Sequence, residues 1–169
     1  TIQGTPLVMT QKMAAPNKSS LVVTVMGNAM QRVIFDGTTG YQEIQGRKMD
    51  MQAAQIEEAK TGAQPFVDMV YKTGTLDRIE PVDGINYYVI KSGTTEVFYD
   101  MKTGLKAKEV KTVKTPRGDV KVPTMFSNYK AVNGIMFPHS VGRKSGPMDL
   151  KFEVSEIKIN EGVSDEDFK

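Results

Sequence analysis

Tight-turn dipeptides recur along the chain and constrain its fold more than any other feature. They separate short runs of β-branched and aromatic residues, and they stand at Asp36-Gly37, Asp83-Gly84, Ser92-Gly93, Thr103-Gly104, Gly118-Asp119 and Asn133-Gly134. Short apolar runs joined by such turns are typical of antiparallel strands connected as hairpins. The sequence therefore predicts a many-stranded antiparallel sheet.

Helical signals occur only in the middle of the chain. Residues 51–60 have helical spacing, with Asp50 placed to cap their start and Gly62 placed to end them. A second short helix is expected over residues 66–71, where Asp68 is the one obviously polar side chain, so this segment should lie against a sheet. The expected fold class is α+β, with helices covering one face of the sheet.

Length and charge exclude several classes of protein. The chain has 169 residues, of which 39% are hydrophobic and 25% are charged, and this suits a single domain over residues 1–169. Its 22 basic and 20 acidic residues give a net charge of +2, too small to predict nucleic-acid binding. The apolar stretches are only strand-sized, so no transmembrane segment is predicted. Because the sequence begins at Thr1 without a Met, we expect a segment excised from a longer protein.

Residue types needed for common catalytic chemistry are missing from the sequence. There is no Cys, which excludes disulfides, thiol nucleophiles and Cys-zinc sites. The single His, His139, excludes motifs that need two, and it is interpreted as a structural or surface residue. Neither a phosphate-binding loop nor a dinucleotide fingerprint is present. We therefore predict no catalytic residue, no metal site and no cofactor in this segment.

One seven-residue pattern occurs twice. Residues 35–41 (FDGTTGY) and 99–105 (YDMKTGL) share an aromatic residue, Asp, Thr, Gly and a final apolar or aromatic residue. Asp can accept hydrogen bonds from turn amides, and Gly can adopt the left-handed conformation that closes a loop. The favoured interpretation is two hairpin turns with the same chemistry. The alternative is a sugar- or metal-binding role for Asp36 and Asp100.

Two charged clusters are interpreted as surface features. The basic cluster between positions 106 and 121 is expected to form the charged edge of a hairpin, and its members are Lys106, Lys108, Lys111, Lys114, Arg117 and Lys121. The alternative is a patch that contacts anionic lipid or an acidic partner. The acidic run Asp165-Glu166-Asp167 is expected to be a solvated terminal segment.

Methionine is frequent, with 11 residues and no Trp. Met side chains are flexible and polarizable, so they fill irregular cores and also form adaptable binding surfaces. Core filling is the favoured interpretation, and a deformable apolar cavity beneath the predicted helices is the alternative.

The C-terminal half resembles a known family. Residues 99–105 (YDMKTGL), 126–138 (FSNYKAVNGIMFP) and 153–160 (EVSEIKIN) follow one another in order, and residues 35–41 add a similar turn in the N-terminal half. This arrangement resembles envelope domains of the LolA/LolB-like lipoprotein-carrier superfamily, of the Bacteroidetes type found at the C-terminus of insulinase/pitrilysin zinc peptidases. The resemblance covers about residues 20–160, and its motifs are turns and strand starts.

The resemblance implies a fold and a class of function. It implies an incomplete antiparallel β-barrel with a short helical lid over its concave face, in the bacterial periplasm or cell envelope. We expect a non-catalytic accessory module that packs on an upstream peptidase domain or holds an apolar group; the alternative is a stand-alone lipid or lipoprotein carrier that holds acyl chains in the concavity. From their apolar character, the residues expected to line the cavity are Met51, Ile56, Phe66, Met69, Val70, Tyr88, Phe98 and Phe126.

Overall fold

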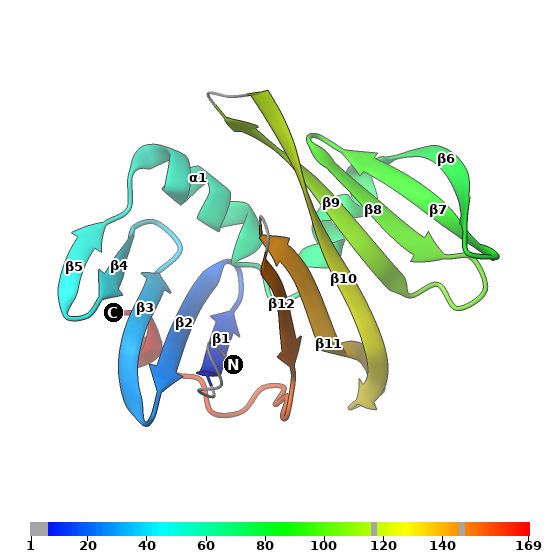
Figure 1. Cartoon of the computed structure of the whole chain (residues 1–169). Coiled ribbons are helices and arrows are strands. Elements are labelled where there is room, and N and C mark those ends of the chain that lie inside the picture. Colours follow the sequence, from blue (N-terminus) through cyan, green and yellow to red (C-terminus); the bar gives the residue numbers. More distant parts are fainter. Residues whose placement is uncertain (1–6, 116–117, 146–147) are drawn as a thin grey trace. The chain divides into compact units, whose positions relative to one another are not determined.

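The computed structural model describes residues 7–115, 118–145 and 148–169 (Figure 1). The chain divides into two compact units, one formed by residues up to Val70 together with Asn160–Lys169 and the other by Tyr71–Ile159. Each unit has its own antiparallel sheet. The antiparallel α+β class is confirmed, but the expectation of one continuous curved sheet is wrong, because the strands form two sheets.

The first unit contains a five-stranded sheet in which every neighbour in space is also a neighbour in sequence. Its strands are β1 (Leu7–Ala14), β2 (Lys18–Val25), β3 (Asn28–Phe35), β4 (Gly40–Ile44) and β5 (Arg47–Asp50). The β2–β3 hairpin turns at Met26 and Gly27, whose φ angles of 49° and 83° suit a two-residue turn between twisted antiparallel strands. The sheet is thus a succession of hairpins, of which the turn dipeptides predicted the one at Asp36-Gly37.

The second unit contains a seven-stranded sheet, also connected strand to strand in sequence order. Its strands are β6 (Thr75–Val82), β7 (Ile85–Ser92), β8 (Thr95–Asp100), β9 (Lys106–Thr115), β10 (Gly118–Val132), β11 (Ile135–Ser145) and β12 (Met148–Glu153). Asp83-Gly84 and Asn133-Gly134 form hairpin turns, and all four residues have positive φ angles between 50° and 82°. The predicted turns therefore separate the strands at these positions.

In the part of the chain that the structure describes, three short helices accompany the sheets: α1 (Ala53–Gly62), η1 (Val67–Thr73) and η2 (Asp165–Phe168). Both helices expected in the middle of the chain are present, although η1 is a tighter 3₁₀ helix. The predicted cap is wrong, because Asp50 ends β5 instead of starting α1. Gln52 is the N-cap, and its backbone N–H donates to Oε1 of Gln55 over 2.8 Å.

Each sheet has a few fully buried side chains. In the first unit, Ile34 and Phe35 follow one another on β3 and are both buried, so their side chains anchor opposite faces. In the second unit, Val97 and Phe98 do the same on β8, and Val89 pairs with Phe98 across the sheet. The two cores are small, and each sheet contributes side chains from both of its faces.

The C-terminal acidic run is exposed at Asp165 and Glu166, as expected, but it is also anchored to the first sheet. Lys12 Nζ lies 2.7 Å from a carboxylate oxygen of Asp167, and Lys18 Nζ lies 2.7 Å from one of Asp165. Phe168 is buried, at 3% exposure. Helix η2 is therefore attached to the first sheet by two ion pairs and one aromatic anchor, and these contacts join residues more than 140 positions apart.

The basic cluster also differs from its prediction. Strand β9 is the central strand of the second sheet, so its lysines do not protect an edge. An irregularity in register at Phe98 and Tyr99 places Lys108 opposite Phe98 and Lys106 opposite Tyr99. Lys106 is buried, with Nζ 4.4 Å from the ring centroid of Phe126. Arg117 lies outside the described residues.

Candidate functional site

The two repeated aspartate motifs form the same type of turn. Asp36 Oδ1 accepts hydrogen bonds from the backbone N–H groups of Thr38 and Thr39, each over 2.7 Å. Asp100 Oδ1 accepts from Lys102 over 2.7 Å and from Thr103 over 2.9 Å. These contacts confirm the interpretation of both motifs as hairpin turns.

The turn amides also favour the charged form of both carboxyl groups. Donation from the backbone of Thr39, and then of Thr38, lowers the pKa of Asp36 below its ordinary value. The backbone of Thr103, and then of Lys102, does the same to the pKa of Asp100. Within the described residues no group of three or more His, Cys, Asp or Glu side chains is arranged to hold a metal ion. The hydrogen bonds from the turn amides therefore explain why both turns contain an aspartate.

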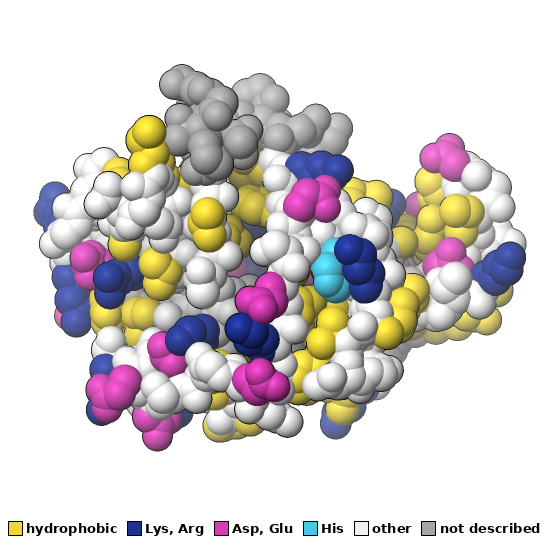
Figure 2. Space-filling view, turned by 90° about the horizontal axis from the view of Figure 1, so that it is seen from below, with side chains coloured by type: hydrophobic (Ala, Val, Ile, Leu, Met, Phe, Trp, Pro, Cys, Tyr) yellow, Lys and Arg dark blue, Asp and Glu magenta, His cyan; other side chains and the backbone are white. Residues whose placement is uncertain are grey.

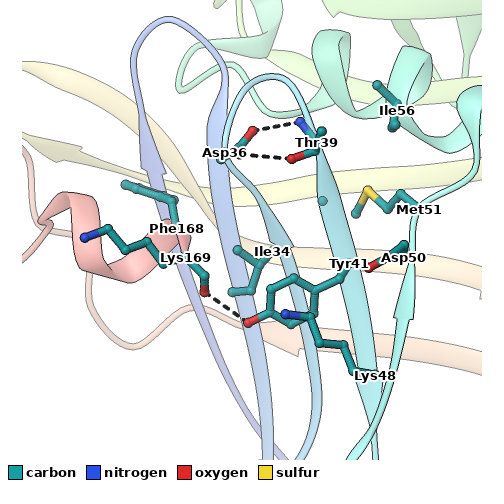
Figure 3. Close-up of a pocket in the computed structure, with 11 residues that line it drawn as sticks. Ile34, Asp36, Thr39, Tyr41, Lys48, Asp50, Met51, Ile56, Phe168 and Lys169 are labelled. Carbon is teal, nitrogen blue, oxygen red and sulfur yellow. Dashed lines mark hydrogen bonds between the residues drawn. The ribbon is translucent and has the colours of Figure 1, made fainter.

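A pocket of about 460 Å³ surrounds Tyr41 at the corner where β5 leaves the sheet for α1 (Figure 3). We call it the Tyr41 pocket, and its lining residues are Ile34, Asp36, Thr39, Gly40, Tyr41, Lys48, Asp50, Met51, Ile56, Phe168 and Lys169. The Tyr41 hydroxyl donates to the Lys169 carbonyl oxygen over 3.1 Å, and Lys48 Nζ lies 3.7 Å from the centroid of the Tyr41 ring. Apolar and charged side chains thus share this pocket.

A second pocket lies between α1 and the other face of the same sheet. We call it the α1 groove; it has a volume of about 320 Å³ and is lined by Gln11, Ser19, Leu21, Val33, Phe35, Gln42, Met51, Gln55, Glu58, Ala59, Gly62 and Ala63. Leu21 pairs with Val33, and Val33 pairs with Gln42, so these side chains form one row across the sheet. None of the ten residues of α1 is buried. The helix therefore covers the sheet without filling the space beneath it.

Met51 is the one residue that lines both pockets. Its backbone N–H donates to the carbonyl oxygen of Gly40 over 2.8 Å. A Cβ atom at Gly40 would lie 2.7 Å from the Met51 sulfur and 2.4 Å from the carbonyl oxygen of Ile34. Glycine at position 40 therefore provides the space in which the Met51 side chain forms a wall shared by the two pockets.

The structure brings together two of the eight residues that we expected to line a cavity. Met51 and Ile56 both line the Tyr41 pocket. Phe66 and Met69 are 47% and 58% exposed, Val70 is half-buried in η1, and these three line neither pocket. A cavity role for them stays a prediction.

The other three predicted lining residues belong to the second unit and do not share one face. Tyr88 pairs with Tyr99 and Val89 with Phe98, so Tyr88 and Phe98 lie on opposite faces of the sheet. Phe126 contacts Lys106, which pairs with Tyr99, and it therefore shares the face of Tyr88. Phe98 is buried beneath two cations, with Lys108 Nζ 3.8 Å and the Arg78 guanidinium carbon 5.8 Å from its ring centroid.

The polar residues of the α1 groove were missed at the level of sequence. Gln11, Gln42 and Gln55 come from β1, β4 and α1, and no local motif connects them. Alternation along Leu21 and Val33 could have indicated which strand positions face the helix. The register that places Gln11 opposite Leu21 and Gln42 opposite Val33 has no signal in the sequence.

His139 and Ser140 are both buried, but they do not form a catalytic pair. As neighbours on β11 they point to opposite faces of the sheet. His139 Nδ1 lies 3.1 Å from the carbonyl oxygen of Phe137, and the Ser140 hydroxyl donates to Glu153 over 3.1 Å. His139 is thus buried, with a backbone carbonyl as its partner.

Comparisons with known proteins agree on the fold alone. The sequence matches no protein-family model and no curated protein. The structure is similar to the crystal structure of a LolA superfamily protein from Nitrosomonas europaea, with a TM-score of 0.61 and 13% sequence identity. The match covers 100% of this chain and 91% of that one. The chain thus has a LolA-like fold, as the resemblance implied. Among the described residues, no helix is long and apolar enough to cross a membrane.

Proposed function

We propose that this chain is a non-catalytic, carrier-type module that holds an apolar group, of the acyl-chain class, in the α1 groove. One observation carries the proposal: α1 lies over a row of apolar strand residues, yet none of its own residues is buried. A helix that served only to complete a core would bury an apolar stripe. The space of about 320 Å³ beneath it lies at the lower end of the range of ligand pockets.

The composition of the groove suits a flexible apolar chain. Leu21, Val33 and Phe35 form its floor, and Met51 forms an adaptable side wall. Each methylene that such a site removes from water contributes about 0.8 kcal/mol. The groove has no titratable side chain other than Glu58, which is exposed at its rim. The length of the bound acyl chain, more than any charge on the ligand, therefore determines the affinity of the groove for its ligand.

We place this module in the bacterial periplasm or cell envelope, in line with its LolA-like fold. In this setting the chain acts as an accessory module of a longer envelope protein, such as one that carries a zinc peptidase domain. A stand-alone lipid or lipoprotein carrier would use the same groove in the same way. Neither arrangement requires catalytic chemistry from this segment.

A substitution that fills the groove tests the proposal. Ala59 lies on α1 and lines the groove, whereas Ala54 is exposed on the same helix and lines neither pocket. Ala59→Trp should displace about two methylenes of a bound chain, which costs about 1.6 kcal/mol and raises Kd about tenfold. Ala54→Trp, the matched control, should leave Kd unchanged. Displacement of a fluorescent fatty-acid analogue measures both, and equal Kd values would contradict the proposed site.

A second function, packing on a partner domain, is favoured by an apolar surface on the second unit. Leu76, Ile79 and Tyr88 are 58%, 54% and 40% exposed on β6 and β7, and register places all three on one face. Figure 2 shows that hydrophobic side chains are also exposed on the face of the molecule that it draws. Large apolar side chains gathered in this way mark interaction surfaces.

Hydrogen exchange tests this second function. If a neighbouring domain covers the surface, amides of β6 and β7 should exchange more slowly in the protein as it occurs in cells than in this chain alone. Amides of β1 to β5 serve as the internal control. Identical exchange of β6 and β7 in both preparations would exclude a partner domain on this surface.

A further inference from the structure

The Tyr41 pocket contains one cation, Lys48, and one anion, Asp50, that form neither an ion pair nor a side-chain hydrogen bond within the part of the chain that the structure describes. Lys48 and Asp50 are two residues apart on β5, so their side chains lie on the same face of the strand. Both line the pocket, and Figure 3 shows the Lys48 side chain over the Tyr41 ring. Other charged residues of the first unit, such as Lys12 and Lys18, have carboxylate partners at 2.7 Å. Lys48 and Asp50 are therefore available to a ligand.

The remaining polar groups of the pocket are already engaged. Asp36 accepts hydrogen bonds from two turn amides and from the hydroxyl of Thr39. The Tyr41 hydroxyl donates to Lys169, and the Lys169 ammonium pairs with Glu166. The pocket thus offers a guest one carboxylate, from Asp50, and one ammonium group, from Lys48, which lies over the Tyr41 ring.

Met51 connects this charged pocket to the apolar groove. Its side chain lines both pockets, which lie on opposite faces of the sheet, and a flexible Met can change rotamer more easily than a branched residue. The α1 groove offers an apolar binding surface, and the Tyr41 pocket next to Met51 offers one positive and one negative charge. That is the chemical pattern of an amphiphile with a single chain and a charged head.

We propose that the Tyr41 pocket binds the zwitterionic headgroup of the amphiphile whose tail lies in the α1 groove. The phosphate of the headgroup lies against Lys48, and its ammonium group lies against Asp50. This inference rests on the proposed function for the tail, and it adds the class of headgroup. A purely anionic headgroup would be repelled by the carboxylate of Asp50. A purely cationic headgroup would be repelled by the ammonium group of Lys48.

Three amphiphiles of equal chain length test the headgroup class. The probes are lysophosphatidylethanolamine, which is zwitterionic, lysophosphatidylglycerol, which is anionic, and an alkyltrimethylammonium salt, each below its micellar concentration. Displacement of a fluorescent fatty-acid analogue gives Kd for each. Because exposed charge pairs contribute modestly, we expect the zwitterionic probe to bind about fivefold more tightly than either of the others.

Variants that remove one charge then test which residues recognise the headgroup. Lys48→Gln and Asp50→Asn should each remove most of the preference for the zwitterionic probe. Arg47→Gln is the matched control, because Arg47 is exposed on the same strand, points to the opposite face and does not line the pocket. Arg47→Gln should leave the preference unchanged.

The outcomes separate the two proposals. Equal affinity for all three probes, with binding that is still weakened by Ala59→Trp, would overturn the headgroup inference and leave the groove in place. A headgroup preference that survives both Lys48→Gln and Asp50→Asn would overturn the inference in the same way. Absence of binding by every probe would overturn the proposed function together with the inference.

Discussion

The two aspartate turns share one sequence pattern, yet the glycine that both motifs contain, Gly40 in one and Gly104 in the other, has a different role in each. In the second unit, Gly104 has a φ of 71°, and a Cβ atom there would meet nothing within 4 Å. In the first unit the left-handed position moves to Gly37, whose φ is 103°. Gly40 is required instead for space, because a Cβ atom would collide with Ile34 and Met51. Glycine at this position of the motif thus allows a positive φ angle in the second unit, whereas in the first unit it leaves room for a neighbouring side chain.

This difference connects local turn chemistry to the candidate site. The turn at Asp100 ends in a hairpin that could tolerate any residue able to adopt a positive φ. The turn at Asp36 ends where Met51 crosses Gly40 and separates the two pockets. Substitutions at the two glycines should therefore affect different properties, and this provides the test of the comparison.

The largest effect is expected for Gly40→Ala. The new methyl group would meet a backbone oxygen that cannot rotate away, so we expect a loss of about 3 kcal/mol in the free energy of unfolding. Urea denaturation measures this loss. The double variant Gly40→Ala/Met51→Ala should recover only part of it, because the clash with Ile34 remains. Full recovery would show that Met51 alone requires the glycine.

A smaller effect is expected for Gly104→Ala. The methyl group has room, so only the cost of a left-handed conformation remains, about 1 kcal/mol. Gly104→Asn should cost less, since Asn adopts this conformation more readily. Neither variant should alter binding of a fluorescent fatty-acid analogue. A loss as large as that of Gly40→Ala would mean that the two glycines have equivalent roles after all.

The smallest effect is expected from the two aspartates, and it depends on pH. Because the turn amides lower both pKa values in the folded state, each carboxylate contributes stability above its unfolded pKa of about 3.9. This contribution is lost as pH falls through the lower, folded pKa. Asp36→Asn and Asp100→Asn should therefore each make the free energy of unfolding less dependent on pH between about pH 5 and pH 2.

Asp83→Asn is the control for this experiment. Asp83 also lies in a hairpin turn, but its carboxylate makes no hydrogen bond to another described residue. Urea denaturation across the pH range should show the wild-type slope for Asp83→Asn. A wild-type slope for Asp36→Asn as well would mean that the turn amides do not stabilise the charged carboxylate.

The sequence predicted the local structure well, because turns and alternation are encoded over a few residues. The paired motifs, the hairpin succession and the two central helices all followed from such signals. Alternation assigns a residue to a face but does not show where one sheet ends, so the division into two sheets was missed. That Phe98 and Tyr88 lie on opposite faces could not be predicted for a related reason, since the register between β7 and β8 is not a local property.

Contacts between distant parts of the chain were the other source of error. The partners of Asp165 and Asp167 lie in β1 and β2, so nothing near the acidic run indicated that it would be anchored. Burial of Lys106 depends on an irregular pairing between β8 and β9. Met51 and Ile56 were found because apolar residues next to a short helix often face the adjoining sheet, whereas Gln11 and Gln42 carry no such signal.

The central claim is that the groove beneath α1 holds an apolar chain, and lipid extraction tests it most directly. The protein would be purified from bacterial membranes, and its lipids would be extracted and identified by mass spectrometry beside a denatured control. We predict one acyl species in stoichiometric amount from the native protein, strongly reduced in Ala59→Trp and retained in Ala54→Trp. A native protein that contains no lipid, or the same lipid content in all three proteins, would contradict the claim.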